Sequence, residues 1–148
     1  MKTALLPRAV RALEDDLSRN AVKHKPKTLF DLALLAWRID EAVRIISRIA
    51  REIDDDYQNS TVSIAVRLSK MSGRKLASWA MPHRAPPPSL ESVQDSIISI
   101  AELPIDLSDS AFPDAVHSLI NPIANMFSGF EFRKNVIENI DKELTSKR

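Results

Sequence analysis

The strongest constraint on the fold is an apolar pattern between positions 32 and 53 that recurs every three or four residues. Its members are Leu32, Leu35, Ile39, Ala42, Ile46, Ile49 and Ile53. This spacing places them on one side of an α-helix with 3.6 residues per turn. Thr28 and Asp31, a hydroxyl and a carboxylate three residues apart, have the spacing of a capping box. The segment therefore predicts a long central helix from about residue 28 to residue 56.

Apolar residues elsewhere in the chain also follow helical spacing. We expect further helices over residues 3–20, 61–81, 89–103, 113–127 and 132–146. The stripe of 61–81 would be Ile64, Leu68, Met71 and Trp79, and that of 89–103 would be Leu90, Val93, Ile97 and Ile100. The chain has only two glycines and few alternating runs, which argues against a sheet. These patterns predict an all-α fold, a compact bundle of five to six helices around a long central amphipathic helix.

The length of the chain, 148 residues, fits one domain covering residues 1–148. Three consecutive prolines at 86–88 form a stiff connector. If the domain is subdivided, we expect the parts to be 1–84 and 89–148, on either side of this connector.

Composition excludes several chemistries. The chain has no cysteine, so it has no disulfide framework, cysteine-ligated zinc site or thiol nucleophile. His24, His83 and His117 lack metal-ligand spacing, and the chain has no glycine-rich phosphate loop. No apolar segment approaches the length of a membrane span, and the first residues do not form a signal peptide. We therefore expect a non-enzymatic cytoplasmic protein without metal or cofactor.

Charge is segregated along the chain, although the net charge is only +1. Residues 57–90 contain five basic residues and no acidic one: Arg67, Lys70, Arg74, Lys75 and Arg84. Residues 85–132 contain seven acidic residues and no lysine or arginine. Segregated charge selects partners and orients them.

One interpretation of the basic segment is nucleic-acid binding. On a helix over 61–81, Arg67, Lys70 and Arg74 would share one face, with Lys75 and Arg84 near its C-terminal end. Such a stripe can contact successive phosphates. The alternative is a solvated helix face whose cations favour the negative end of the helix dipole.

The leading hypothesis is a helical interaction or assembly protein, a subunit of a larger complex or a homo-oligomer. Opposite charges on two surfaces favour ordered association, so Glu91 and Asp95 are candidate partner-binding residues. Trp37 lies off the apolar stripe and is either covered by another helix or bound by a partner. The alternative for the charges is that the basic and acidic regions meet within one chain.

A third hypothesis comes from the string Arg19-Asn20-Ala21-Val22-Lys23-His24. It resembles the Arg-Asn-three-residues-His signature of HEPN ribonucleases over six residues of the 148. The resemblance implies an all-helical ribonuclease in which Arg19 and His24 act on RNA at a dimer interface. A histidine can transfer protons near neutral pH, and an arginine can stabilise phosphoryl charge. The alternative is a basic linker between two helices.

Overall fold

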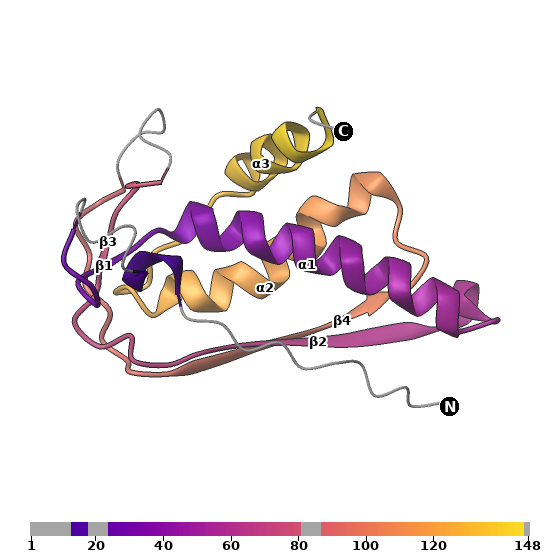
Figure 1. Cartoon of the computed structure of the whole chain (residues 1–148), viewed down its shortest axis with the longest axis horizontal. Helices are drawn as coiled ribbons and strands as arrows, with labels where there is room; N and C mark the ends of the chain where they lie inside the picture. The colour runs from indigo at the N-terminus through magenta and orange to yellow at the C-terminus, as the bar shows by residue number, and fades with distance from the viewer. Residues whose placement is uncertain (1–12, 18–23, 81–86, 147–148) are drawn as a thin grey trace.

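The computed structural model describes residues 13–17, 24–80 and 87–146, and within them the chain is a mixed α/β fold. The prediction of an all-α bundle is wrong. The described part contains three α-helices, α1 (Leu32–Ile53), α2 (Phe112–Asn125) and α3 (Lys134–Ser146). It also contains two small sheets of two strands each. Figure 1 shows the longer sheet lying along one side of the helices.

The central helix predicted from the sequence is confirmed, with a later start. The N-cap of α1 is Asp31, whose side chain accepts a hydrogen bond from the Leu34 N–H. Thr28 therefore lies before the helix rather than at its cap. Leu29 and Phe30 form a short strand instead of a first helical turn. The carboxylate of the predicted capping box acts as the cap itself, because it reaches a free amide of the first turn.

The two segments predicted as the third and fourth helices are strands. β2 (Thr61–Leu68) pairs antiparallel with β4 (Ile97–Pro104), with Thr61 opposite Pro104 and Leu68 opposite Ile97. Val62, Ile64 and Leu68 of β2 are buried, and the residues between them face solvent or are half-buried. This alternation is the period of a strand with one buried face. The β-branched residues of β2 also favour a strand.

The helices form layers on one face of the β2–β4 hairpin (Figure 1). α2 packs against β4, α1 packs against α2 and lies beside β2, and α3 packs on α1 and α2. The core contains Val43 of α1, Leu119 and Ile120 of α2 and Ile137 of α3, all fully buried. Pro122 lies inside α2, whose C-cap is Met126, and beyond the cap the Gly129 N–H donates to the carbonyl of Asn125.

A second small sheet closes the end of the molecule where α1 begins. β1 (Leu29–Phe30) pairs parallel with β3 (Lys75–Leu76). A 3₁₀ turn at Glu14–Asp16 is bonded to this end of the fold. Most of the helix predicted over 3–20 lies outside the described residues. Because β2 and β4 come from opposite sides of the proline connector, strand pairing joins residues 1–84 to residues 89–148.

Candidate interaction surfaces

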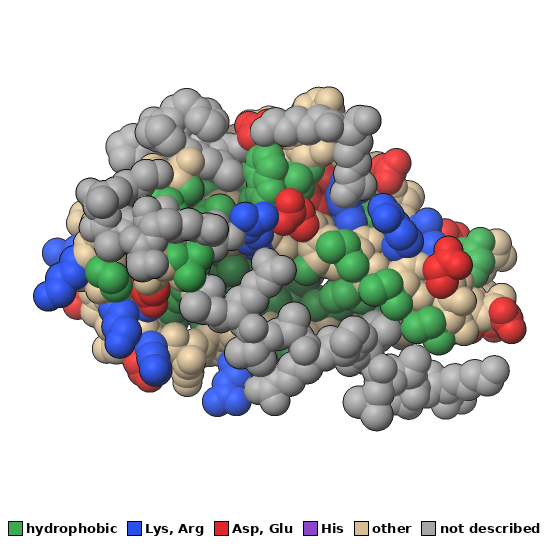
Figure 2. All heavy atoms as spheres, in the orientation of Figure 1, with side chains coloured by type: hydrophobic (Ala, Val, Ile, Leu, Met, Phe, Trp, Pro, Cys, Tyr) green, Lys and Arg blue, Asp and Glu red, His purple; other side chains and the backbone are tan. Residues whose placement is uncertain are grey.

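The solvent-facing side of α1 carries a line of isoleucines. Ile45, Ile49 and Ile53 are spaced four residues apart and are 54%, 36% and 60% exposed. Ala42 extends the line by one turn and is also exposed. Because residues i and i+4 are neighbours on a helix surface, these side chains form one continuous apolar stripe, the α1 stripe. In Figure 2, hydrophobic side chains gather on this face of the molecule, along α1 and between it and the hairpin.

The outer face of the β2–β4 hairpin is a second exposed apolar surface. Ile98 and Ile100 of β4 are 57% and 63% exposed, and Ala65 lies opposite Ile100. Arg67 and Glu102, one on each strand, also face outward. This outer hairpin face is therefore apolar in its centre and charged toward its ends, the arrangement found at many protein interfaces.

The predicted nucleic-acid residues do not share a helix face, because the helix does not exist. Arg67 lies on β2, Lys70 lies in the turn after β2, and Lys75 lies on β3; all three are exposed. Arg84 lies outside the described residues. Figure 2 shows several Lys and Arg side chains at the end of the molecule where β1 and β3 lie. Nucleic-acid binding stays a prediction, now without its helical geometry.

Arg74, the fifth residue of that set, is buried. Its guanidinium forms a bidentate pair with Asp16, at 2.8 Å from Nη1 to Oδ1 and 2.6 Å from Nη2 to Oδ2. Its Nε donates to the carbonyl of Lys70, and Nη1 also donates to the carbonyl of Leu29. The Arg74 hydrogen bond lowers the pKa of Asp16. Arg74 therefore joins the 3₁₀ turn to β1 and the turn after β2, and it is not presented to a phosphate.

Asp15 and His24 belong to the same buried network. Asp15 Oδ1 accepts from the Asp31 N–H at 2.9 Å and from Trp79 Nε1 at 2.6 Å. Burial raises the pKa of Asp15, although these hydrogen bonds oppose the shift. The His24 ring packs on Trp79 at 4.9 Å, and its Nε2 lies 2.6 Å from the carbonyl of Asp15.

The ribonuclease hypothesis gains no site from this network. Arg19 lies outside the described residues, and His24 is held by groups of its own chain. The mixed α/β fold also differs from the all-helical fold that the HEPN resemblance implies.

The predicted partner-binding residues lie in three different settings. Trp37 is half-buried, packs against the core and donates from Nε1 to Glu41 at 3.1 Å. Glu91 is exposed and its backbone bridges antiparallel to Lys75. Asp95 is exposed, and its carbonyl accepts from the Met71 N–H. A basic and an acidic segment therefore meet within one chain, as the alternative interpretation of the charges requires.

A second polar cluster joins α1 to α3. Arg44 donates from Nε to Asp40 at 3.1 Å, also contacts Asp141, and lies 4.2 Å from the centre of the Phe112 ring. Asp40 is fully buried, and its Oδ2 accepts no hydrogen bond from the described residues. Burial raises the pKa of Asp40 to about 7; Arg44 opposes the shift and the Asp141 carboxyl adds to it.

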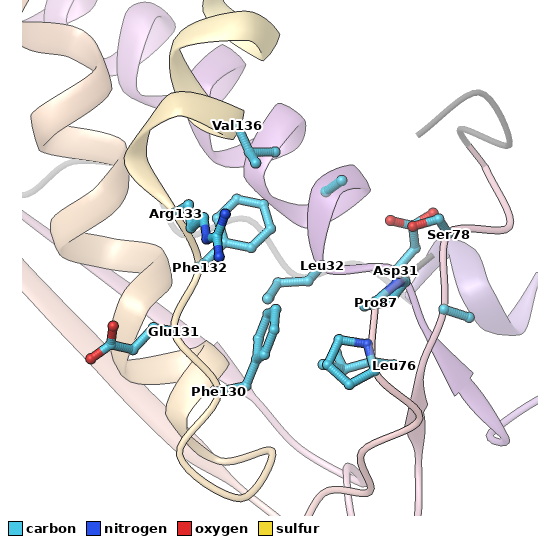
Figure 3. A pocket seen from close by; sticks show the side chains of 13 residues that line it. Asp31, Leu32, Leu76, Ser78, Pro87, Phe130, Glu131, Phe132, Arg133 and Val136 are labelled. Atoms are coloured by element: carbon cyan, nitrogen blue, oxygen red, sulfur yellow. The ribbon is translucent and has the colours of Figure 1, made fainter. Parts of the chain in front are cut away.

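A cavity of about 490 Å³ lies between the start of α1, β3 and residues 130–136. Figure 3 shows Leu32 and Phe130 pointing toward each other across it and Glu131 pointing away. Asp31 is at its wall, but its two oxygens already accept from the N–H groups of Leu34 and Ala80. Most of the residues that line the cavity are apolar, and the buried carboxylate of Asp31 serves as the N-cap of α1.

In residues 13–17, 24–80 and 87–146, no three histidine or acidic side chains are grouped to hold a metal ion. No helix there combines the length and apolarity needed to cross a bilayer.

Comparison with known proteins adds no relative: the chain matches no family model, no curated protein and no solved structure.

Sequence reasoning missed both exposed apolar surfaces. It placed Ile49 and Ile53 in the buried stripe of the central helix and Ile100 in the stripe of a helix that is a strand. A signal was present, because Ile45 lies outside that stripe on the same helix. A helix that is apolar over more than one face has more than one surface to cover.

Proposed function

We propose that this chain is a non-enzymatic interaction domain that assembles with protein through the α1 stripe. The observation that carries the proposal is the exposure of Ile45, Ile49 and Ile53 in one line on a regular helix. Single exposed apolar residues are normal on protein surfaces, but contiguous ones mark interaction sites. The charged side chains of Arg48 and Glu52 lie next to the stripe and are exposed. An apolar centre with a charged margin supports binding of a protein surface.

The test is to recover the tagged chain from its native host and to measure the protein bound to it, including further copies of itself. The stripe variant changes Ile45, Ile49 and Ile53 to Ser. A matched control changes Gln58 and Lys142, two exposed polar residues, to Ser. We expect the stripe variant to lose bound protein and the control to keep it. A wild-type chain that is recovered as a monomer with nothing bound would overturn the proposal.

A further inference from the structure

We infer that the α1 stripe binds a second copy of this chain, about a two-fold axis that also pairs the edge of β2 opposite β4 with the β2 of that copy. This inference rests on the proposed function and names its partner. In the resulting dimer the two hairpins would form one four-stranded sheet, and the two α1 helices would lie antiparallel above it.

Among the described residues, β2 pairs with β4 alone, so the opposite edge of β2 has no partner strand there. Every second residue of an antiparallel strand directs its N–H and C=O away from its neighbour, so the outer edge of an eight-residue β2 presents a row of backbone donors and acceptors. A second β2 running antiparallel satisfies that edge and doubles the sheet.

The α1 stripe and the β2 edge lie on the same side of the molecule. α2 packs on β4, whereas α1 lies beside β2. Figure 1 shows α1 and β2 together on the side facing the viewer, and Figure 2 shows the hydrophobic side chains exposed there. A partner that pairs with the β2 edge therefore also covers α1.

One flank of the α1 stripe borders the hydrophobic core. At 3.6 residues per turn, Ile46 and Ile53 lie on the flank of the stripe next to the buried residues Ile39 and Ala50. Ile46 is itself half-buried against the core. The stripe therefore continues from the hydrophobic core outward, so that two copies placed side by side would join their cores across the interface.

The charges beside the α1 stripe favour a second copy of this chain as the partner. Arg48 and Glu52 lie on the other flank of the stripe, away from the core, and are four residues apart. In an antiparallel pair of α1 helices centred near Ile49, Arg48 of each copy approaches Glu52 of the other. A surface bearing both signs in this order is complementary to itself under two-fold rotation, which is the requirement of an isologous interface.

The positions of Ile49 along α1 and of the start of β2 are compatible with a single two-fold axis. Ile49 lies about 6 Å along α1 before Ile53, at 1.5 Å per residue. β2 begins near the same end of the molecule, and about 6 Å along it from Thr61 is a distance of roughly two residues. An axis that passes Ile49 therefore passes β2 near Ser63, the third of its eight residues, and pairs residues 61–65 of the two copies.

The first experiment measures the mass of the purified chain by analytical ultracentrifugation over a range of concentrations. We expect a dimer. The variant with Ile45→Ser and Ile49→Ser should raise the dimer dissociation constant by at least about tenfold, because both side chains lose buried contact area. The matched control, Ile98→Ser with Ile100→Ser on the outer hairpin face, should stay dimeric. Far-UV circular dichroism confirms that each variant is folded.

The second experiment uses the absence of cysteine from the chain. Ile49→Cys places one thiol beside the proposed axis, and Ile98→Cys places one on the outer hairpin face. A short bismaleimide should cross-link Ile49→Cys to a covalent dimer at low protein concentration and leave Ile98→Cys monomeric. Equal cross-linking of both variants would overturn the two-fold arrangement.

The third experiment reverses the charges. Arg48→Glu and Glu52→Arg should each weaken the dimer several-fold, and the double variant should restore it, because each contact again joins opposite charges. A double variant as weak as the two singles would contradict the antiparallel pairing of α1.

These outcomes separate the dimer from the proposed function. A purified chain that stays monomeric at all concentrations, yet binds another protein that the Ile45→Ser, Ile49→Ser variant cannot bind, overturns the dimer and keeps the interaction domain. A monomer that binds nothing overturns both.

Discussion

Arg74 and Asp16, 58 residues apart in the chain, form a bidentate ion pair in which the arginine side chain is 1% exposed. The pair ties the 3₁₀ turn at Glu14–Asp16 to the β1–β3 end of the fold. Arg74 depends on this partner, because a guanidinium left alone there is an uncompensated buried charge, whereas the Asp16 side chain is 21% exposed.

Asp16→Ala should therefore lower the free energy of unfolding by about 3–5 kcal/mol, because it leaves the buried Arg74 guanidinium without a carboxylate partner. Urea denaturation followed by circular dichroism at pH 7 measures the loss. Combining Arg74→Met with Asp16→Asn should cost less than the sum of the two single changes, since the pair is removed as a unit. The pKa of Asp16 is lowered in the folded state, so the stabilisation is present above its ordinary pKa of 3.8 and disappears as the pH falls below that value. Additive costs for the two changes would contradict the pairing.

The sequence correctly predicted α1, α2 and α3 because each has a long apolar stripe of helical period. It failed for β2, where Val62, Ile64 and Leu68 alternate but Ile64, Leu68 and Met71 also fit a helix. A run of eight residues is too short for period alone to decide between the two.

β4 shows a second physical cause of failure. Its outward residues Ile98 and Ile100 are apolar, and the residue between them, Ser99, is buried. The alternation expected of a half-buried strand is therefore absent from the sequence of β4. The same apolar outer residues make the hairpin a candidate interaction surface, so the feature that hid the strand belongs to the site.

The buried position of Arg74 could not be predicted from its neighbours. Arginine is ordinarily exposed, and its burial depends on Asp16, from a distant segment whose placement requires the β1–β3 pairing. Exposure of Ile49 and Ile53 was likewise unpredictable from period alone. The period of a helix identifies its apolar faces but does not say which of them its own chain covers.

Trp79 provides a second test of the buried network. Trp79→Phe removes the N–H that donates to Asp15 Oδ1 at 2.6 Å and keeps a ring beside His24. A buried carboxylate that loses a donor should cost about 1–3 kcal/mol in unfolding free energy. The matched control is Trp37→Phe, because Trp37 donates to Glu41 on the same helix and near the surface. We expect the control to cost less, and equal losses would contradict a special role for Trp79.

The loss in Trp79→Phe should grow with pH. The pKa of Asp15 is raised in the folded state by burial, so its contribution to stability declines as the pH rises above 3.8 toward the folded pKa. The hydrogen bond from Trp79 lowers the pKa of Asp15. Trp79→Phe removes this bond and raises that pKa further, so the stability of the variant keeps falling up to a higher pH than that of wild type. Denaturation of wild type and variant at pH 4 and pH 8 measures the difference, and an equal loss at both values would contradict the assignment.

The exposed basic residues supply a test of nucleic-acid binding. Reversing Arg67, Lys70 and Lys75 to Glu should reduce retention on heparin and the salt dependence of that retention, if these residues contact phosphates. Arg74 is left unchanged because it is buried and paired with Asp16. Wild-type retention that is indifferent to salt, or unaffected by the three reversals, would remove this hypothesis.

Asp40 predicts a pH-dependent stability at the α1–α3 contact. Its pKa is raised to about 7 by burial, so between pH 4 and pH 7 the folded state holds a proton that the unfolded state has released. Its contribution to stability therefore falls as the pH rises through this range, by at most about 1.4 kcal/mol per pH unit. Asp40→Asn keeps the shape of the side chain and removes the titration.

As the pH rises from 5 to 7, we expect the unfolding free energy of wild type to fall relative to that of Asp40→Asn. Above pH 8 the difference between the two proteins should be constant. Urea denaturation of both proteins across pH 5–8.5 measures it. Asp141→Asn is the companion variant: it removes the neighbouring carboxyl that raises the Asp40 pKa, and so it should move the midpoint of the pH effect downward. Arg44 keeps one carboxylate partner in either variant. If the difference in unfolding free energy between wild type and Asp40→Asn does not change with pH, Asp40 is ionised throughout this range.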